Sequence, residues 1–201
     1  MSMSAPLPRM TSAEYLELER AADFKSEFVN GEIVAMAGAS IRHNDIVAGV
    51  MLALSRQLTG RPCQVNFLDV KVKSEATDSY FYPDLIVICG GIVHGDHHRD
   101  TLVNPTVLVE VLSPSTEAYD RGAKAAHYRL IESVQEYVLI AQDQPMIEVY
   151  SRQGNHWLLS EARALDEAVE LASISCRLPL SEVYERVDFA PPASPDSGEL
   201  A

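Results

Sequence analysis

Apolar residues recur at steps of three and four in some parts of the chain and alternate with polar residues in others. The first spacing predicts helices with one apolar face, and the second predicts strands with one buried face. Helices are expected over residues 11–22, 40–59, 117–131 and 178–187. The first begins with the capping-box pattern Thr11-Ser12-Ala13-Glu14, and the second stops at Gly60.

Strand patterns fall between these helices. Asn30-Gly31 separates the segments 26–29 and 32–36, which predicts a hairpin with a two-residue turn. Further strands are expected within residues 63–73 and 80–89, and over residues 106–112. Residues 136–140, 146–150 and 156–159 predict a closing meander of three strands.

Composition narrows the class of protein. With 201 residues, 47% of them hydrophobic, the chain is long enough for one domain, expected over residues 1–188, before a disordered acidic and proline-rich tail at 189–201. The chain has no apolar run of membrane-spanning length and no secretory signal, so a cytoplasmic protein without a membrane partner is expected. The net charge of -13 argues against general affinity for nucleic acid but leaves room for a local basic groove.

Two groups of reactive side chains are assigned no role. Cys63, Cys89 and Cys176 are odd in number and far apart, and Cys89 ends an aliphatic run, so it is interpreted as a small buried hydrophobe. Residues 94–100 hold three histidines and two aspartates. Because metal-binding histidines are usually held by secondary structure, this glycine-containing segment is interpreted as a solvated loop.

Two acids interrupt runs that otherwise predict buried strands. Asp84 precedes Leu85-Ile86-Val87-Ile88, and Glu110 lies within the aliphatic run 107–112. An ionised acid in such a strand needs a cation, a metal or a hydrogen-bond network beside it. If the two strands are neighbours, both carboxylates can bind Mg²⁺ or Mn²⁺, which prefer oxygen ligands. Such an ion activates water and polarises phosphoryl oxygens, which suits hydrolysis of a phosphodiester.

Polar residues on two predicted helices can complete such a site. Asp120, Lys124 and Tyr128 are spaced by four and share one face of the helix that follows Glu110. Lys124 can orient water or neutralise developing charge, or it can be a surface lysine paired with Asp120. Tyr128 can hydrogen-bond to the site or simply pack, and His43 can meet the site or cap its helix.

Together these residues resemble the Uma-two (Uma2) family of restriction-endonuclease-like proteins, within the PD-(D/E)XK nuclease superfamily. The resemblance covers roughly residues 10–188. It rests on Pro83-Asp84, the segment Val109-Glu110-Val111-Leu112-Ser113-Pro114-Ser115-Thr116, Asp120, Lys124 and Tyr128, and it extends to Glu27-Phe28-Val29-Asn30-Gly31-Glu32-Ile33 and to Gly38-Ala39-Ser40 with His43.

The resemblance implies an α/β (α+β mixed-sheet) fold, a restriction-endonuclease-like core in which helices flank a central mixed β-sheet. It implies that Asp84 and Glu110 bind the metal and that Glu27 matches an extra acid often supplied earlier in the chain. The superfamily usually places a lysine two residues after the glutamate, where this chain has Leu112. Similar proteins supply the lysine from the following helix, which makes Lys124 the matching residue. Two lysines on a neighbouring predicted strand, Lys71 and Lys73, are rivals.

The expected function is a Mg²⁺- or Mn²⁺-dependent endonuclease that hydrolyses phosphodiester bonds in DNA. Its catalytic residues would be Asp84, Glu110, Lys124 and Glu27, with His43, Tyr128 and Asp120 as accessory candidates. A homodimer is expected, because a small nuclease that cuts both strands commonly acts as a symmetric pair. The alternatives are a catalytically inactive nuclease-fold interaction or regulatory protein, favoured by the acidic charge, and a hydrolase of small phosphoesters.

Overall fold

The computed structural model describes residues 9–36, 38–67 and 70–189. Its helices are α1 (Ser12–Ala21), α2 (Ile41–Leu58), α3 (Glu117–Tyr119), α4 (Ala125–Tyr128) and α5 (Leu180–Val183), with a π-helical segment η1 (Asp120–Lys124) joining α3 to α4 and a 3-10 turn η2 (Ala172–Ile174). Its strands are β1 (Ser26–Val29), β2 (Glu32–Ala35), β3 (Cys63–Phe67), β4 (Lys71–Ser74), β5 (Ser79–Phe81), β6 (Leu85–Cys89), β7 (Thr101–Leu102), β8 (Val107–Val111), β9 (Glu136–Ile140), β10 (Ile147–Gln153), β11 (His156–Ala162), β12 (Ala168–Leu171) and β13 (Cys176–Pro179). The predicted tail lies almost entirely outside the described residues.

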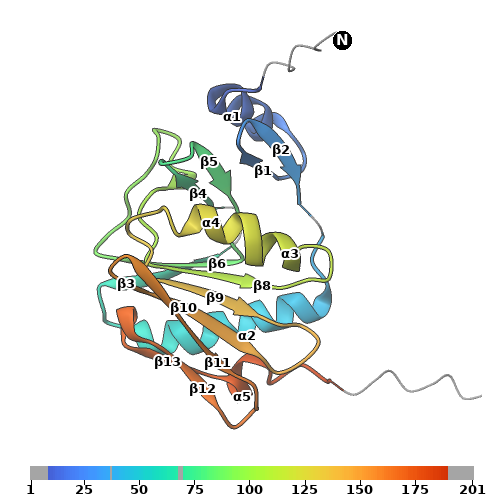
Figure 1. The fold of residues 1–201 in the computed structure, drawn as a ribbon, viewed down its shortest axis with the longest axis vertical. Helices are drawn as coiled ribbons and strands as arrows, with labels where there is room; N and C mark the ends of the chain where they lie inside the picture. The colour runs from blue at the N-terminus through green and yellow to red at the C-terminus, as the bar shows by residue number, and fades with distance from the viewer. Residues whose placement is uncertain (1–8, 37, 68–69, 190–201) are drawn as a thin grey trace, which may run out of the picture.

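The strands form a six-stranded sheet, a five-stranded sheet and a hairpin (Figure 1). The six-stranded sheet has the order β11-β10-β9-β8-β6-β3, and it is mixed because β8 and β9 are parallel while the other neighbours are antiparallel. The five-stranded sheet has the order β2-β1-β5-β4-β7. The expected mixed sheet is thus confirmed, whereas the second sheet and the β12–β13 hairpin were not predicted.

Both faces of the six-stranded sheet are covered, which explains the nearly continuous aliphatic sequences of β6 and β8. On one face α2, α5 and the β12–β13 hairpin pack against alternate residues such as Val87 and Val109. On the other face α4 and residues of the five-stranded sheet pack against the intervening residues, such as Ile86 and Leu108 (Figure 1). Fully buried strands lose the polar alternation of half-exposed ones.

The local signals at the chain's turns and caps match the structure. Thr11 and Glu14 form both hydrogen bonds of the predicted capping box. Asn30 and Gly31 have φ angles of 53° and 87° and close the β1–β2 hairpin, as their residue types predict. The predicted helix at 178–187 is shorter than expected, because Leu178 pairs with Val169 in a strand before α5 begins.

The interpretation of Cys89 as a small buried hydrophobe with no role misses its bond to Cys63. Cys63 and Cys89 face each other across β3 and β6, with Cα atoms 4.0 Å apart, and they form a disulfide. The strand register brings together two residues that lie 26 positions apart in the sequence. Cys176 is free and buried. Among the described helices, none is long and apolar enough to cross a membrane.

Candidate active site

The two acids that interrupt aliphatic runs lie side by side. β6 and β8 are antiparallel neighbours, and Leu85 faces Val109, so Asp84 and Glu110 are adjacent at the same end of this strand pair. The backbone N–H of Val111 donates to Oδ2 of Asp84 at 2.7 Å. Strand pairing therefore sets the relative position of both carboxylates.

Lys124 lies among three buried carboxylates. Its Nζ is 3.0 Å from Oε1 of Glu27, 3.0 Å from Oε1 of Glu110 and 3.3 Å from Oδ1 of Asp120. All four side chains are almost fully buried. Asp120 and Lys124 belong to the π-helical segment η1, and π-helical insertions are frequent at functional sites. The alternative of an exposed lysine paired only with Asp120 is therefore wrong.

Two tyrosines hold the glutamates in place. The Tyr128 hydroxyl donates to Oε1 of Glu110 at 2.7 Å, and the Tyr119 hydroxyl donates to Oε2 of Glu27 at 3.1 Å. The Tyr128 ring also packs edge-on against Phe81, so this residue both packs and hydrogen-bonds. Within the described part of the chain no hydrogen bond reaches Oε2 of Glu110, which leaves that oxygen as an available ligand atom.

Charge is unbalanced in this cluster, and burial together with neighbouring charges shifts the pKa values of Glu110 and Lys124. Burial raises the pKa of Glu110 well above its usual value; Lys124 opposes the rise, while Asp84 and the other neighbouring acids add to it. Burial works against the charge of Lys124, but Glu110, Glu27 and Asp120 raise its pKa well above the ordinary range. An arrangement with more carboxylates than cations attracts a further positive ion.

His43 touches the site from the first turn of α2. Ser40 caps this helix by accepting a hydrogen bond from the His43 backbone N–H, and the His43 ring nitrogen Nε2 is 3.1 Å from Oδ1 of Asp84. On its other side, Nδ1 is 3.5 Å from Nε2 of Gln142, an amide that donates to the Leu112 carbonyl. Sequence reasoning missed Gln142, which follows β9 and carries no local motif.

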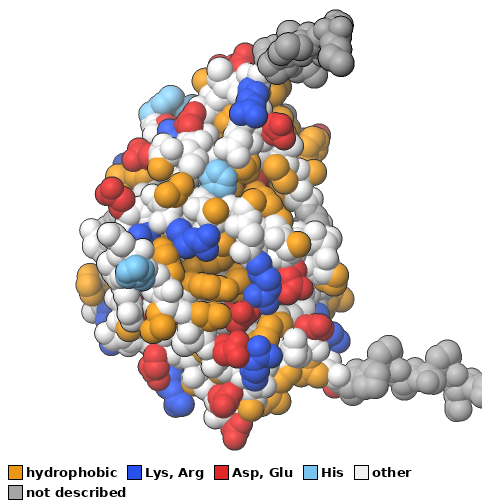
Figure 2. Space-filling view, in the orientation of Figure 1, with side chains coloured by type: hydrophobic (Ala, Val, Ile, Leu, Met, Phe, Trp, Pro, Cys, Tyr) orange, Lys and Arg blue, Asp and Glu red, His pale blue; other side chains and the backbone are white. Residues whose placement is uncertain are grey.

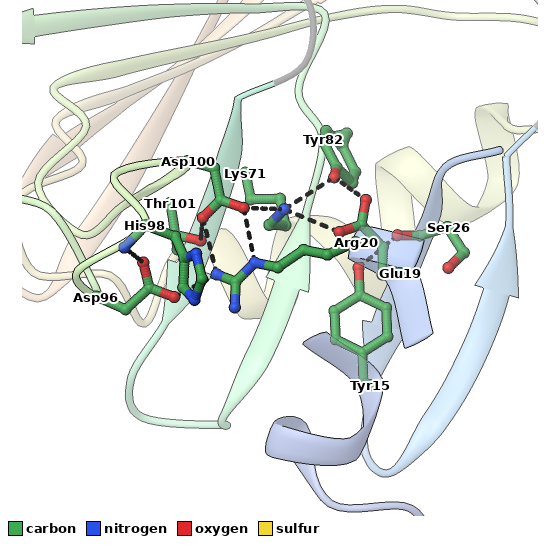
Figure 3. A network of polar contacts seen from close by, with 10 residues as sticks. All are labelled: Tyr15, Glu19, Arg20, Ser26, Lys71, Tyr82, Asp96, His98, Asp100 and Thr101. Carbon is green, nitrogen blue, oxygen red and sulfur yellow. Dashed lines mark hydrogen bonds and ion pairs between the residues drawn. The ribbon is translucent and has the colours of Figure 1, made fainter. Parts of the chain in front are cut away.

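The rival lysines lie elsewhere. Lys71 is buried in a separate network, with its Nζ 2.9 Å from carboxylate oxygens of both Glu19 and Asp100 (Figure 3). This network joins α1 to β4 and to the loop before β7. Lys73 pairs with Asp78, 3.3 Å away, on the same hairpin. Lys124 therefore lies beside Glu27, Glu110 and Asp120, and neither of the rival lysines does.

The loop at 94–100 contributes to the same separate network. Arg20 of α1 forms ion pairs with Asp96 and Asp100, as Figure 3 shows. No group of three or more histidine, cysteine or acidic residues within the described ranges is arranged to hold a metal ion. The tyrosine Tyr82 connects this network to the acids, because its hydroxyl contacts Glu19 and Lys71 while its backbone N–H donates to Glu27.

A cavity of about 350 Å³ opens onto the acids. Apolar residues at the end of β2 line one part of the cavity, and hydroxyl-bearing residues just before α3 line another. Its acidic lining residues are Glu27, Asp84, Glu110 and Asp120, and its basic ones are Lys25, Lys124 and His43. Mg²⁺ needs only one or two protein carboxylates beside waters and substrate oxygens, so Asp84 and Glu110 fit a two-carboxylate site even though the described residues hold no three-ligand cluster.

One family model and two bacterial proteins are similar to this chain over most of its length. The Uma2 family model, described as "Putative restriction endonuclease", matches residues 12–181. Two proteins of Synechocystis sp. are similar along nearly their whole length: the uncharacterized protein sll1609, 35% identical over 86% of this chain and 98% of its own, and the uncharacterized protein slr1290, 33% identical over 94% and 98%.

A solved structure has a similar fold. It is the crystal structure of "a putative nuclease belonging to DUF820" from Anabaena variabilis, with a TM-score of 0.71 over 88% of this chain and 98% of that one. At 18% identity, this likeness establishes a shared fold.

Proposed function

Because the chain belongs to the Uma2 family of restriction-endonuclease-like proteins, we propose that it is a Mg²⁺- or Mn²⁺-dependent endonuclease that hydrolyses phosphodiester bonds in DNA. The membership confirms the resemblance drawn from the sequence motifs. The observation that supports the activity best is that the buried Lys124 contacts both Glu27 and Glu110, and that Asp84 lies beside Glu110 at the wall of the same cavity.

Asp84 and Glu110 would hold the ion, with Oε2 of Glu110 free of protein hydrogen bonds among the described residues. When bound, such an ion supplies Lewis acidity and lowers the pKa of a water molecule. The hydrogen bonds from Val111 and Tyr128 fix the orientation of the two ligand carboxylates before anything binds. Preorganised ligands avoid a cost of rearrangement during the reaction.

Lys124 would stabilise negative charge that develops on the phosphate. Its ammonium group is held by Glu27 and by the proposed metal ligand Glu110. Its raised pKa keeps it charged at neutral pH. Glu27 acts here as a positioning residue, since its contacts are to Lys124, to the Tyr119 hydroxyl and to the backbone N–H of Tyr82. His43 holds Asp84 in the same way.

The test is a cleavage and metal-binding assay on matched variants. Purified protein is incubated with supercoiled plasmid, single-stranded DNA and RNA in Mg²⁺ or Mn²⁺, and Mn²⁺ binding is followed by calorimetry. Asp84→Asn should abolish cleavage and weaken metal binding while its thermal unfolding curve stays cooperative. Asp78→Asn, at an exposed turn position with φ of 46°, is the control and should keep both. Absence of cleavage and of metal binding in the unchanged protein would refute the proposal.

The excess of acids around the cavity favours a second candidate, a catalytically inactive interaction or regulatory protein with the nuclease fold. Acidic surroundings disfavour a long phosphate groove. Such a protein would keep its partner after Asp84→Asn and would not need Mg²⁺. A hydrolase of small phosphoesters would instead turn over a model phosphodiester without binding polynucleotides. Action as a homodimer and location in the cytoplasm stay predictions.

A further inference from the structure

β11 is an edge strand of the six-stranded sheet, and no other described strand pairs with its outer side. It has seven residues, His156–Ala162, and pairs with β10 without interruption from Ile147 opposite Ala162 to Gln153 opposite His156. The opposite edge strand, β3, has five residues. Natural edge strands are usually kept from pairing with other chains by lysine, proline, bulges or short length. The sequence His-Trp-Leu-Leu-Ser-Glu-Ala contains neither lysine nor proline, its one acidic residue, Glu161, lies next to the end of the strand, and its register shows no bulge.

Apolar side chains are exposed on both faces of this strand. Leu158 is 53% exposed and Leu159 is 45% exposed. They project to opposite faces, because Leu159 lies opposite Tyr150 and Leu158 lies opposite Ser151. The indole of Trp157 shares the face of Leu159 and is covered in part by the Arg152 guanidinium, 4.5 Å from the ring. Figure 2 shows hydrophobic side chains, with basic ones beside them, around the position of β10.

The backbone of β11 is also available for pairing. A two-residue turn at Gly154-Asn155 joins Gln153 to His156, and such a turn closes with a hydrogen-bonded pair. Antiparallel pairing then alternates along the strand, so the N–H and C=O groups of Trp157 and Leu159 point away from β10. These outward groups alternate with those of Leu158, which face β10.

We propose that this edge binds a second copy of the chain, with the two β11 strands antiparallel about a two-fold axis at Leu158. In this register Leu158 faces its own copy, and Trp157 faces Leu159 of the second copy on both sides of the axis. The outward backbone groups of these two residues then bond to each other. Glu161 falls opposite Asn155, so no like charges oppose each other. The central Trp-Leu-Leu triplet is thus matched to itself, as a symmetric interface requires.

A register centred on Leu159 would be poorer. It would place the Trp157 indole opposite the Glu161 carboxylate of the second copy, which wastes an apolar contact and desolvates an acid. The interface leaves Asp84, Glu110 and Lys124 in place in each copy, so dimerisation does not depend on the proposed nuclease activity and survives Asp84→Asn.

The first test measures the mass of the full chain by light scattering over a concentration series up to the millimolar range. A dimer of twice 22.1 kDa is expected, and Leu158→Asp should shift it to the monomer. Leu18→Asp is the matched control, because Leu18 is also 53% exposed but lies on α1. A monomer at every concentration, or a dimer that persists in Leu158→Asp, would overturn the proposal.

Cysteine cross-linking tests the register. Leu158→Cys should form a disulfide-linked dimer on mild oxidation, because residues on the axis face each other at a distance suited to a disulfide. Leu159→Cys and the control Leu18→Cys should not. The native cysteines do not compete, since two are already joined and Cys176 is buried. Cross-linking of Leu159→Cys with none of Leu158→Cys would contradict the proposed axis.

Discussion

Replacing Lys124 with methionine removes a charge while keeping most of the side-chain length. In the folded protein this leaves Glu27, Glu110 and Asp120, which are 3%, 4% and 3% exposed, without their shared cation. Removal of one partner from a buried ion pair typically costs about 3–5 kcal/mol, because the remaining charge stays desolvated. We expect a loss of this size in the free energy of unfolding at pH 7.5.

The loss should shrink as the pH falls. Glu110 already has a folded-state pKa well above its ordinary value of 4.5, and without Lys124 the rise will be larger. A carboxyl group with a raised folded-state pKa favours folding when protonated, and this contribution is lost as the pH rises through that pKa. Lys124→Met should therefore differ most from the unchanged protein near pH 8 and least near pH 5.

The assay is urea unfolding followed by circular dichroism from pH 5 to 8. Lys73→Met is the control, because Lys73 pairs with a mostly exposed Asp78 and the cost should be below about 1 kcal/mol. Adding Glu27→Gln to Lys124→Met should recover part of the stability, because one unpaired charge is removed. A loss below about 1 kcal/mol that does not vary with pH would refute this account of the cluster.

Three further predictions concern other parts of the structure. Tyr128→Phe removes the hydrogen bond to Glu110 and should lower the free energy of unfolding by about 1.5–3 kcal/mol in the same urea assay, and an unchanged value would contradict this. Reduction of the Cys63–Cys89 disulfide, which closes a 26-residue separation, should lower it by about 3 kcal/mol, and an unchanged unfolding curve in Cys63→Ser would contradict this. Arg20, and to a smaller extent Lys71, lower the pKa of Asp100 below its ordinary value of 3.8. Ionised Asp100 therefore stabilises the fold fully above pH 3.8, and this contribution is lost as the pH falls below that value. Asp100→Asn should flatten the acid side of a plot of stability against pH, and an unchanged plot would contradict this prediction.

Local sequence signals predicted most elements because their physical causes are local. The capping box at Thr11, the Asn30-Gly31 turn and the three-to-four spacing of the helix after Ser40 each act within a few residues. Asp84 and Glu110 were conspicuous for a similar reason, since an acid in an aliphatic run is anomalous wherever the strand lies. The spacing of Asp120, Lys124 and Tyr128 fixed their shared helix face in advance.

The partners of these residues could not be predicted from local signals. The β12–β13 hairpin, the five-stranded sheet and the pairing of Cys63 with Cys89 depend on strand register between segments far apart in the chain. Lys71 and Lys124 were both plausible catalytic lysines, and burial beside different carboxylates separated them.

The sequence by itself therefore determined which residues needed a partner, because the cost of a charge in an apolar strand is a local property. Only the tertiary structure decided which partner each one has: Lys124 and Tyr128 for Glu110, His43 for Asp84, and Glu19 with Asp100 for Lys71. These choices follow from how two sheets and a helix pack together. No short segment of the chain contains that information.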